Sequence, residues 1–192
     1  HLRLVEAGLL PLTVESSDLL HYQRRLLDDG TLLVLVSQSG RSAEILRLLE
    51  AVRGRDVATL AVTNTAESPL AREASAVVLT HAGEEATVSC KTYLAAQMAL
   101  GWLGEVLADG DRDAARAALA EAIPGAAAYL ASWRSHVEWL AGRLDGVRAV
   151  YYTGRGPSLA AAAAAGLITK ESTHRPSEGM SGAAFRHGPM EM

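Results

Sequence analysis

Short apolar runs bounded by turn residues recur along the first half of the chain. They lie at Leu32 to Val36, Val57 to Val62 and Ala76 to Leu79, with a shorter one near Leu10 to Val14. Such runs predict buried parallel strands. Between the first two, Ser42 to Val52 has helical spacing, with one apolar face made of Ile45, Leu48, Leu49 and Val52. The alternation predicts an α/β fold with a doubly wound parallel sheet, in which functional residues follow the strands.

The second half of the chain is mostly helix-like. Helical segments are predicted from Lys91 to Leu107 and from Arg112 to Leu144, with interruptions at Ala108 to Asp111 and at Pro124. A new strand is predicted at Val147 to Thr153. A glycine turn at 154–156 and an alanine-rich helix to about residue 171 follow it. We therefore predict a first domain over residues 1–108, a helical connection over 109–145 and the start of a second, similar domain over 146–192.

The alanine tract at 160–165 has two interpretations. It can be a low-complexity segment, or its small side chains can let a helix lie close against a sheet. We favour the close-packing interpretation.

Composition narrows the classes of function. The chain has 192 residues, 49% of them hydrophobic, which is enough for a sizeable core. Its net charge is −4 and its 18 basic residues are scattered, which argues against nucleic acid as a partner. No apolar stretch approaches the length of a membrane span, and the single cysteine excludes an internal disulfide framework. A cytoplasmic protein is expected. Because the chain starts at His1 without a signal-peptide pattern, we expect a fragment cut at both ends.

The strongest local signal directly follows the first predicted strand. Ser37, Gln38, Ser39 and Ser42 surround Gly40 and Arg41, just before a predicted helix. A helix amino terminus offers unpaired amides and partial positive charge, and the hydroxyls add donors, so this loop suits a phosphate group. An equally simple alternative is that Ser39 caps the helix and Ser42 decorates its first turn.

A second loop follows the strand that ends near Leu79. Ser89 or Lys91 in this loop could face a sugar or a phosphate, although the acidic run at 84–85 could equally be a solvated helix start. Cys90 is expected to be a small buried residue without a catalytic role. Asn64, Thr65 and Ser68, followed by Pro69, predict a turn and a helix cap.

A third group lies near the end of the chain. Glu171 ends the alanine-rich helix and His187 precedes Gly-Pro. A carboxylate and an imidazole are the groups needed to open a sugar ring and to move a proton between adjacent carbons through an enediol. A surface glutamate and a turn histidine are the plain alternatives. The histidines have no metal-ligand spacing on one helix, so we predict no metal site and no cofactor.

Taken together, these motifs resemble the SIS (sugar isomerase) domain family and, within it, the isomerase half of glucosamine-6-phosphate synthase. The resemblance rests on 37–42, the run 82–93, the turn 154–156 and the segment 170–189. It implies two flavodoxin-like, three-layer αβα domains. It implies that Ser37, Gln38, Ser39 and Ser42 contact the phosphate and sugar, with Ser89 on the opposite loop.

The same resemblance implies roles for the third group. Glu171 corresponds to the isomerising base, and His187 to the ring-opening residue that the family supplies from the neighbouring subunit. A homodimer with a shared site is thus expected. The sequence departs from the synthase pattern at Ile168, where the synthase has a lysine, and at Arg41, where an acidic residue is usual.

Three functions are weighed on this basis. The leading hypothesis is an enzyme that isomerises a phosphorylated sugar or amino sugar, with amine transfer or deamination as a coupled reaction. A non-catalytic phosphosugar-binding regulatory module would need neither Glu171 nor His187, so their presence favours the enzyme. A purely structural dimerisation module gives no reason to place hydroxyls after a buried strand.

Overall fold

The computed structural model of the protein describes residues 1–191, and the chain divides into two compact units. The first comprises residues 3–112 and the second begins at Asp113. Each unit contains parallel strands connected through helices, so the predicted α/β class is confirmed. Within residues 1–191, no helix has the length and apolar character needed to span a bilayer.

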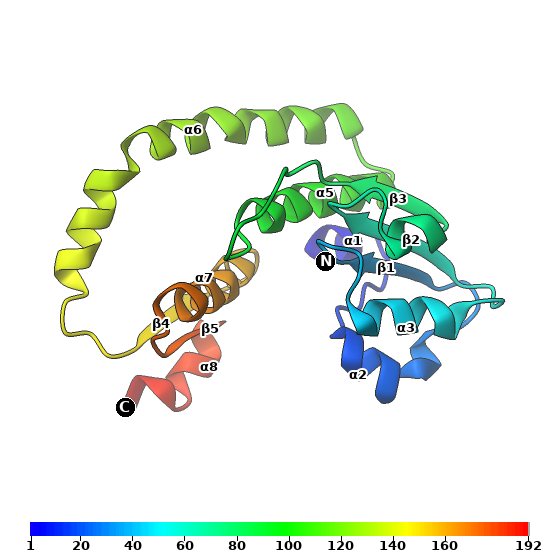
Figure 1. Ribbon diagram of the computed structural model, residues 1–192, viewed down its shortest axis with the longest axis horizontal. Coiled ribbons are helices and arrows are strands. Elements are labelled where there is room, and N and C mark those ends of the chain that lie inside the picture. Colours follow the sequence, from blue (N-terminus) through cyan, green and yellow to red (C-terminus); the bar gives the residue numbers. More distant parts are fainter. Residues whose placement is uncertain (192) are drawn as a thin grey trace. The chain divides into compact units, whose positions relative to one another are not determined.

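The first unit is built on a parallel sheet with the order β1-β2-β3 (Figure 1). Its strands are β1 (Leu32–Val36), β2 (Ala58–Thr63) and β3 (Ala76–Leu79). Val34 pairs with Leu60, and Ala61 with Val77. The predicted bounds of β1 and β3 are confirmed, and β2 lies one residue further along than predicted.

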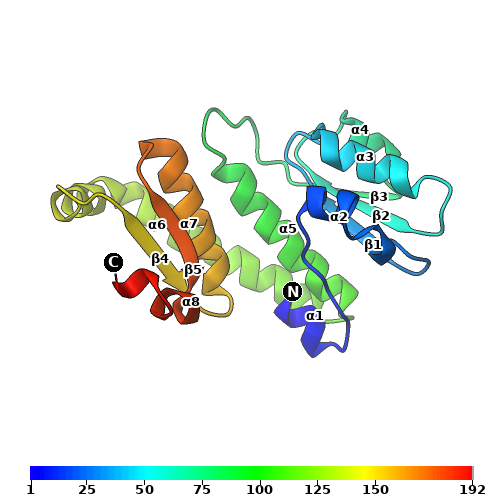
Figure 2. The same ribbon diagram turned by 90° about the horizontal axis from the view of Figure 1, so that it is seen from below.

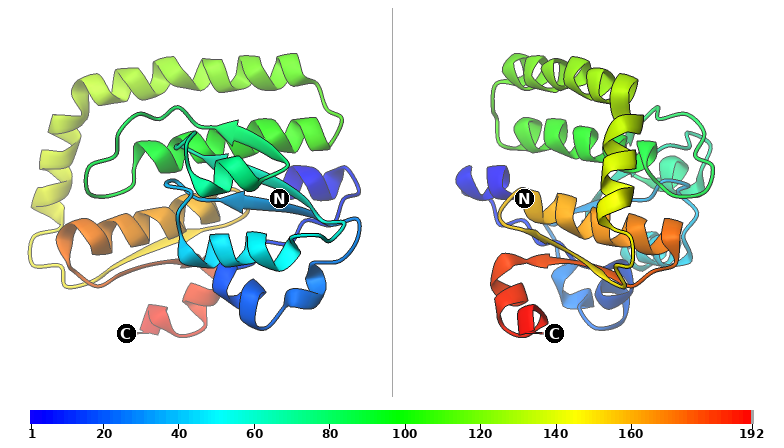
Figure 3. Two further views of the ribbon diagram at one scale, coloured as in Figure 1. Left: turned by 45° about the vertical axis from the view of Figure 1, so that its right-hand side comes forward. Right: turned by 90° about the vertical axis from the view of Figure 1, so that its left-hand side faces the viewer.

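Helices cover both faces of this sheet. Figures 1 and 3 show α3 on one face and α5 on the other. The predicted apolar face of α3 packs with Leu33 and Leu35 of β1 in one buried cluster. Burying a leucine such as Leu48, 1% exposed, stabilises the fold by about 1.5–3 kcal/mol.

The helices of this unit are α1 (Leu2–Glu6), α2 (Ser16–His21), a short 3-10 turn (Arg24–Leu26), α3 (Ala43–Val52), α4 (Pro69–Glu73) and α5 (Lys91–Leu107).

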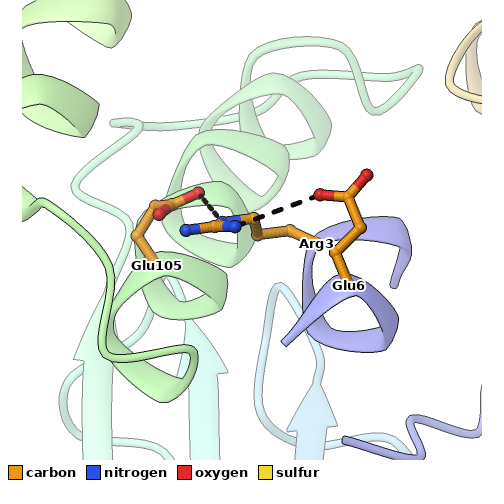
Figure 4. A network of polar contacts seen from close by, with 3 residues as sticks. All are labelled: Arg3, Glu6 and Glu105. Atoms are coloured by element: carbon orange, nitrogen blue, oxygen red, sulfur yellow. Dashed lines mark hydrogen bonds and ion pairs between the residues drawn. The ribbon is translucent and has the colours of Figure 1, made fainter. Parts of the chain in front are cut away.

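A charged contact ties the start of the chain to α5. The Arg3 guanidinium donates to Glu105 at 2.8 Å and lies 4.0 Å from the Glu6 carboxylate (Figure 4). Arg3 is about half exposed, so solvent screens this contact and it contributes little to stability.

The strand expected near Leu10 to Val14 is not formed, and this prediction is wrong. The segment has no regular secondary structure, and Leu10 is 87% exposed and Leu12 60% exposed. Pro11 has no N–H to donate to a strand neighbour. Only Val14 packs against the core.

The second unit contains α6 (Arg112–Arg143), a 32-residue helix with Pro124 in its interior. The expected interruption at 108–111 is confirmed, but the expected break at Pro124 is wrong. Proline removes one backbone hydrogen bond and crowds the preceding turn, which bends a helix without necessarily ending it. Figure 1 shows α6 bending along its length. None of its residues is buried.

After α6 the chain forms a parallel pair of strands, β4 (Val150–Gly154) and β5 (Ser177–Ser181), connected by α7 (Ser158–Thr173). Figure 2 shows α7 lying against both strands. A Cβ added to Gly179 of β5 would collide with the backbone of Ala162 and Ala163 in α7. The small residues of the alanine tract therefore do allow close packing. The helix α8 (Gly182–Arg186) and a 3-10 turn (Pro189–Glu191) follow.

Candidate functional site

The first candidate loop directly follows β1 and is held by polar contacts. The Ser37 and Ser42 hydroxyls lie 3.2 Å apart, and Ser37 is buried. The Gln38 carbonyl accepts from the Asn64 N–H at 3.0 Å and from the Thr63 hydroxyl at 3.1 Å. The loop backbone is thus fixed by the end of β2, while the Gln38 side chain is exposed.

The serines of this loop do not cap α3. Ser42 is the N-cap residue, yet its side chain accepts no bond from the first helical amides. The Ser39 hydroxyl accepts from the Arg41 N–H at 3.3 Å, one residue before the cap. The simple capping alternative is therefore not what the structure has. Hydroxyls and helix amides at this position suit an oxyanion.

The neighbouring helices of the same sheet differ in this respect. The Ser68 hydroxyl caps α4 by accepting from the Ala71 N–H at 3.2 Å, which confirms the predicted cap. A carboxylate from its own loop, that of Glu85, occupies the start of α5. Of these three helices, only α3 begins without a side-chain acceptor at its first amides.

Gly40 shapes the first loop. Its φ is +60°, and its carbonyl accepts from the Leu70 N–H at 3.3 Å. A Cβ at this position would collide with the Ser68 side chain, which is fully buried. Only glycine combines this backbone conformation with such a close approach.

Asn64 connects the second loop to the end of β2. Its side-chain carbonyl accepts from the Thr80 hydroxyl at 3.0 Å and from the Ala82 N–H at 2.8 Å, and its amide donates to the Gly83 carbonyl at 2.7 Å. Its backbone N–H donates to the Gln38 carbonyl. From the sequence, Asn64 was assigned only to a turn. Its position directly after β2 marks Asn64 as a candidate. Its hydrogen-bond partners, 16 to 19 residues further along the chain, leave no pattern in the sequence.

Glu85 holds the other end of the second loop. One of its oxygens accepts from the Thr92 N–H at 2.9 Å, the Thr92 hydroxyl at 2.7 Å and the Cys90 N–H at 3.1 Å. These bonds, those from Thr92 foremost, hold the pKa of Glu85 below its ordinary value. Glu85 is thus a cap of α5 and not merely part of a solvated run.

Ser89 joins the same cluster, with its hydroxyl 2.6 Å from that of Thr92. Thr92 is 3% exposed, while Ser89 is exposed. Cys90 is exposed, so the expected burial of its thiol is wrong. It is the N-cap residue of α5, whose side chain has no reason to enter the core. Lys91 is also exposed.

Replacing Asn64 by alanine is expected to loosen the second loop. Three side-chain bonds are lost, while the backbone bond to Gln38 remains. Amide hydrogen exchange at Ala82 should accelerate by about 10-fold or more, since each net bond is worth roughly 1 kcal/mol. Asn64→Asp keeps the acceptor and should recover part of the protection. Unchanged exchange in Asn64→Ala would show that the loop is held without this side chain.

The third group lies in the second unit. Glu171 is exposed on the last turn of α7, and His187 is exposed as the C-cap of α8. Within residues 1–191 no hydrogen bond or ion pair joins them. Near Glu171, Lys170 pairs with Glu178 at 3.2 Å and the Thr169 hydroxyl lies 3.0 Å from that of Tyr152. Ile168, at the position of the synthase lysine, is half-buried.

The structure brings Ser37, Gln38, Ser39 and Ser42 together on one loop, and Asn64 joins this loop to the start of the loop that carries Ser89. The serine loops lie in the first unit, Glu171 and His187 in the second. An open cavity in the second unit is lined by neither Glu171 nor His187. Its lining is Ala149, Tyr151, Lys170, Pro176, Ser177 and Glu178. No set of three or more histidine, cysteine or acidic side chains in residues 1–191 is placed to hold a metal ion.

Known proteins are similar to this chain in sequence and in fold. Residues 4–104 match the model of the SIS domain. The glutamine–fructose-6-phosphate aminotransferase (isomerizing) of Symbiobacterium thermophilum is 35% identical over 178 residues, which is 89% of this chain and 29% of that protein. The corresponding aminotransferase of Bradyrhizobium diazoefficiens is 32% identical over 95% of this chain and 31% of its own length. The chain thus spans less than a third of these curated relatives.

Solved structures similar to this chain belong to the same kind of protein. A Silicibacter pomeroyi protein assigned as a phosphosugar isomerase has a TM-score of 0.81 and 32% identity, covering 98% of this chain and 56% of that one. The C-terminal domain of a glucosamine-fructose-6-phosphate aminotransferase from Francisella tularensis has a TM-score of 0.84 and 23% identity, covering 98% and 55%, and shows likeness of fold alone. With more than half of its residues matched by the family model, the chain belongs to the SIS domain family.

Proposed function

We propose that this chain binds a phosphorylated sugar or amino sugar and isomerises it between its aldose and ketose forms. The observation that carries the proposal is the loop after β1, where serine hydroxyls surround helix amides that no side chain of the loop caps. A phosphate dianion would accept from these donors and gain from the helix dipole. Membership of the SIS family, with relatives named as isomerising aminotransferases, supports this ligand class.

The proposed chemistry needs two proton-transfer groups. His187 would move a proton between the ring oxygen and the anomeric hydroxyl, which opens the ring and exposes the carbonyl. Glu171 would then remove the proton from the carbon next to the carbonyl, giving an enediolate. The hydroxyl proton on that carbon's oxygen would pass to the former carbonyl oxygen, and Glu171 would return its proton to the neighbouring carbon. The carbonyl moves by one carbon and the carboxylate is regenerated, so the isomerisation itself needs no co-reactant.

Two features belong to the proposal for the whole protein. By the resemblance to the synthase, His187 would act in the site of a second copy, so the active form would be a homodimer. Amine transfer or deamination would be coupled to the isomerisation, and the relatives named as isomerising aminotransferases support the first of these.

Calorimetric titration with fructose 6-phosphate and glucosamine 6-phosphate tests the ligand class. Ser39→Ala combined with Ser42→Ala removes two hydroxyls that are not buried, so folding is expected to persist. Each lost bond to a charged phosphate should lower affinity by roughly 10-fold or more. Ser135→Ala, exposed on α6, is the matched control. Equal affinity in the double variant and the control would exclude this loop as the phosphate site.

A further inference from the structure

The hydrogen bonds around Ser89 run in one direction. Glu85 accepts from two backbone N–H groups, which hold its pKa below the ordinary value, and as a carboxylate at neutral pH it can only accept. The single hydroxyl proton of Thr92 points to Glu85, over 2.7 Å. The Thr92 oxygen is therefore the acceptor in its 2.6 Å contact with Ser89, and Ser89 is the donor.

This direction limits what Ser89 can offer to a ligand. A serine hydroxyl has one proton and two lone pairs, and here the proton is already given to Thr92. Thr92 is 3% exposed, so no water replaces Ser89 there without a rearrangement. The exposed oxygen of Ser89 keeps its lone pairs, which accept from a donor and not from a phosphate dianion.

From this geometry we infer that Thr92 and Glu85 are positioning residues that present Ser89 as an acceptor, so that Ser89 recognises a hydroxyl or ammonium group of the sugar and not its phosphate. The inference deepens the proposed function and rests on it. It separates two roles that the sequence left open for this loop: the first loop takes the phosphate, and Ser89 selects the polar group on the sugar.

Two probes distinguish the roles. Inorganic phosphate reports the anion site alone, while fructose 6-phosphate reports the anion site and the sugar contacts. Both are titrated by NMR against the chain and against Ser89→Ala, Thr92→Val and Thr92→Ser. Ser89→Ala changes an exposed side chain and leaves the Glu85 cap in place. Thr92→Val keeps the side-chain volume but removes the hydroxyl that connects Ser89 to Glu85, and Thr92→Ser keeps that hydroxyl.

We expect Ser89→Ala and Thr92→Val to weaken fructose 6-phosphate binding by about 3- to 10-fold, while inorganic phosphate binding stays within about twofold. Thr92→Ser should recover the sugar affinity because it restores the hydroxyl, whereas a merely structural role of Thr92 in the loop would make Thr92→Val weaken both probes together. If both probes weaken equally in Ser89→Ala, Ser89 donates to phosphate and the inference is overturned, although the proposed function stands. If the unaltered chain binds neither probe, the proposed function and the inference both fail.

Discussion

Glu171→Gln is expected to reduce isomerase turnover by roughly 10²- to 10⁴-fold, the range that a positioned proton-transfer group contributes. The side chain is exposed on the last turn of α7, so the isosteric amide should leave the fold intact. The amide cannot take a proton from carbon. Affinity for fructose 6-phosphate should stay within about twofold, because the proposed phosphate donors lie on another loop.

The assay should compare kcat and binding in Glu171→Gln with those in Glu138→Gln, an exposed carboxylate of α6 in the same unit. Glu138→Gln should match the unaltered protein. Since the proposed site includes a second copy, the full-length protein is the material for this assay. Full turnover in Glu171→Gln would exclude Glu171 as the base, whereas no turnover in the unaltered full-length protein would favour a non-catalytic phosphosugar-binding module.

Gly40→Ala is expected to destabilise the first unit strongly, although it adds only one methyl group. The new Cβ would lie at a positive φ of +60°, which costs about 1–2 kcal/mol. It would also collide with the buried Ser68 side chain and crowd Leu70, which adds about 1–3 kcal/mol. Chemical denaturation should therefore show a loss of about 2–5 kcal/mol, together with lost sugar-phosphate binding.

Gly54→Ala is a matched control for the cost of placing alanine at a positive φ without a steric collision. Gly54 has a φ of +78°, and nothing lies within 4 Å of the added Cβ. Its loss should be about 1–2 kcal/mol, without an effect on ligand binding. Equal losses in the two variants would mean that the contact between the first loop and Ser68 is not tight.

The parts of the fold that the sequence predicted are those with a local pattern. The apolar run of β1 and the one-sided face of α3 are both local, and both are found where expected. By contrast, β5 has the sequence Ser-Glu-Gly-Met-Ser, too polar to signal a strand. It pairs with β4, and Gly179 lets α7 approach its backbone; both contacts are visible only in three dimensions.

The site divides in the same way. The serines after β1 form a contiguous string, so their position could be predicted from the strand before them. The contacts of Asn64 and Glu85 could not, because they depend on chain segments brought together by folding. The expected strand at 10–14 and the expected break at Pro124 show the opposite error. In both places a local pattern was present, but residues 10–14 form no strand and Pro124 lies inside a continuous helix.

The most direct test of the central claim is a crystal structure of the full-length protein with fructose 6-phosphate. The account predicts the phosphate group within hydrogen-bond distance of the Ser39 and Ser42 hydroxyls and the first amides of α3, with a sugar hydroxyl donating to Ser89. A phosphate bound at the start of α5, with the Glu85 carboxylate displaced, would contradict it.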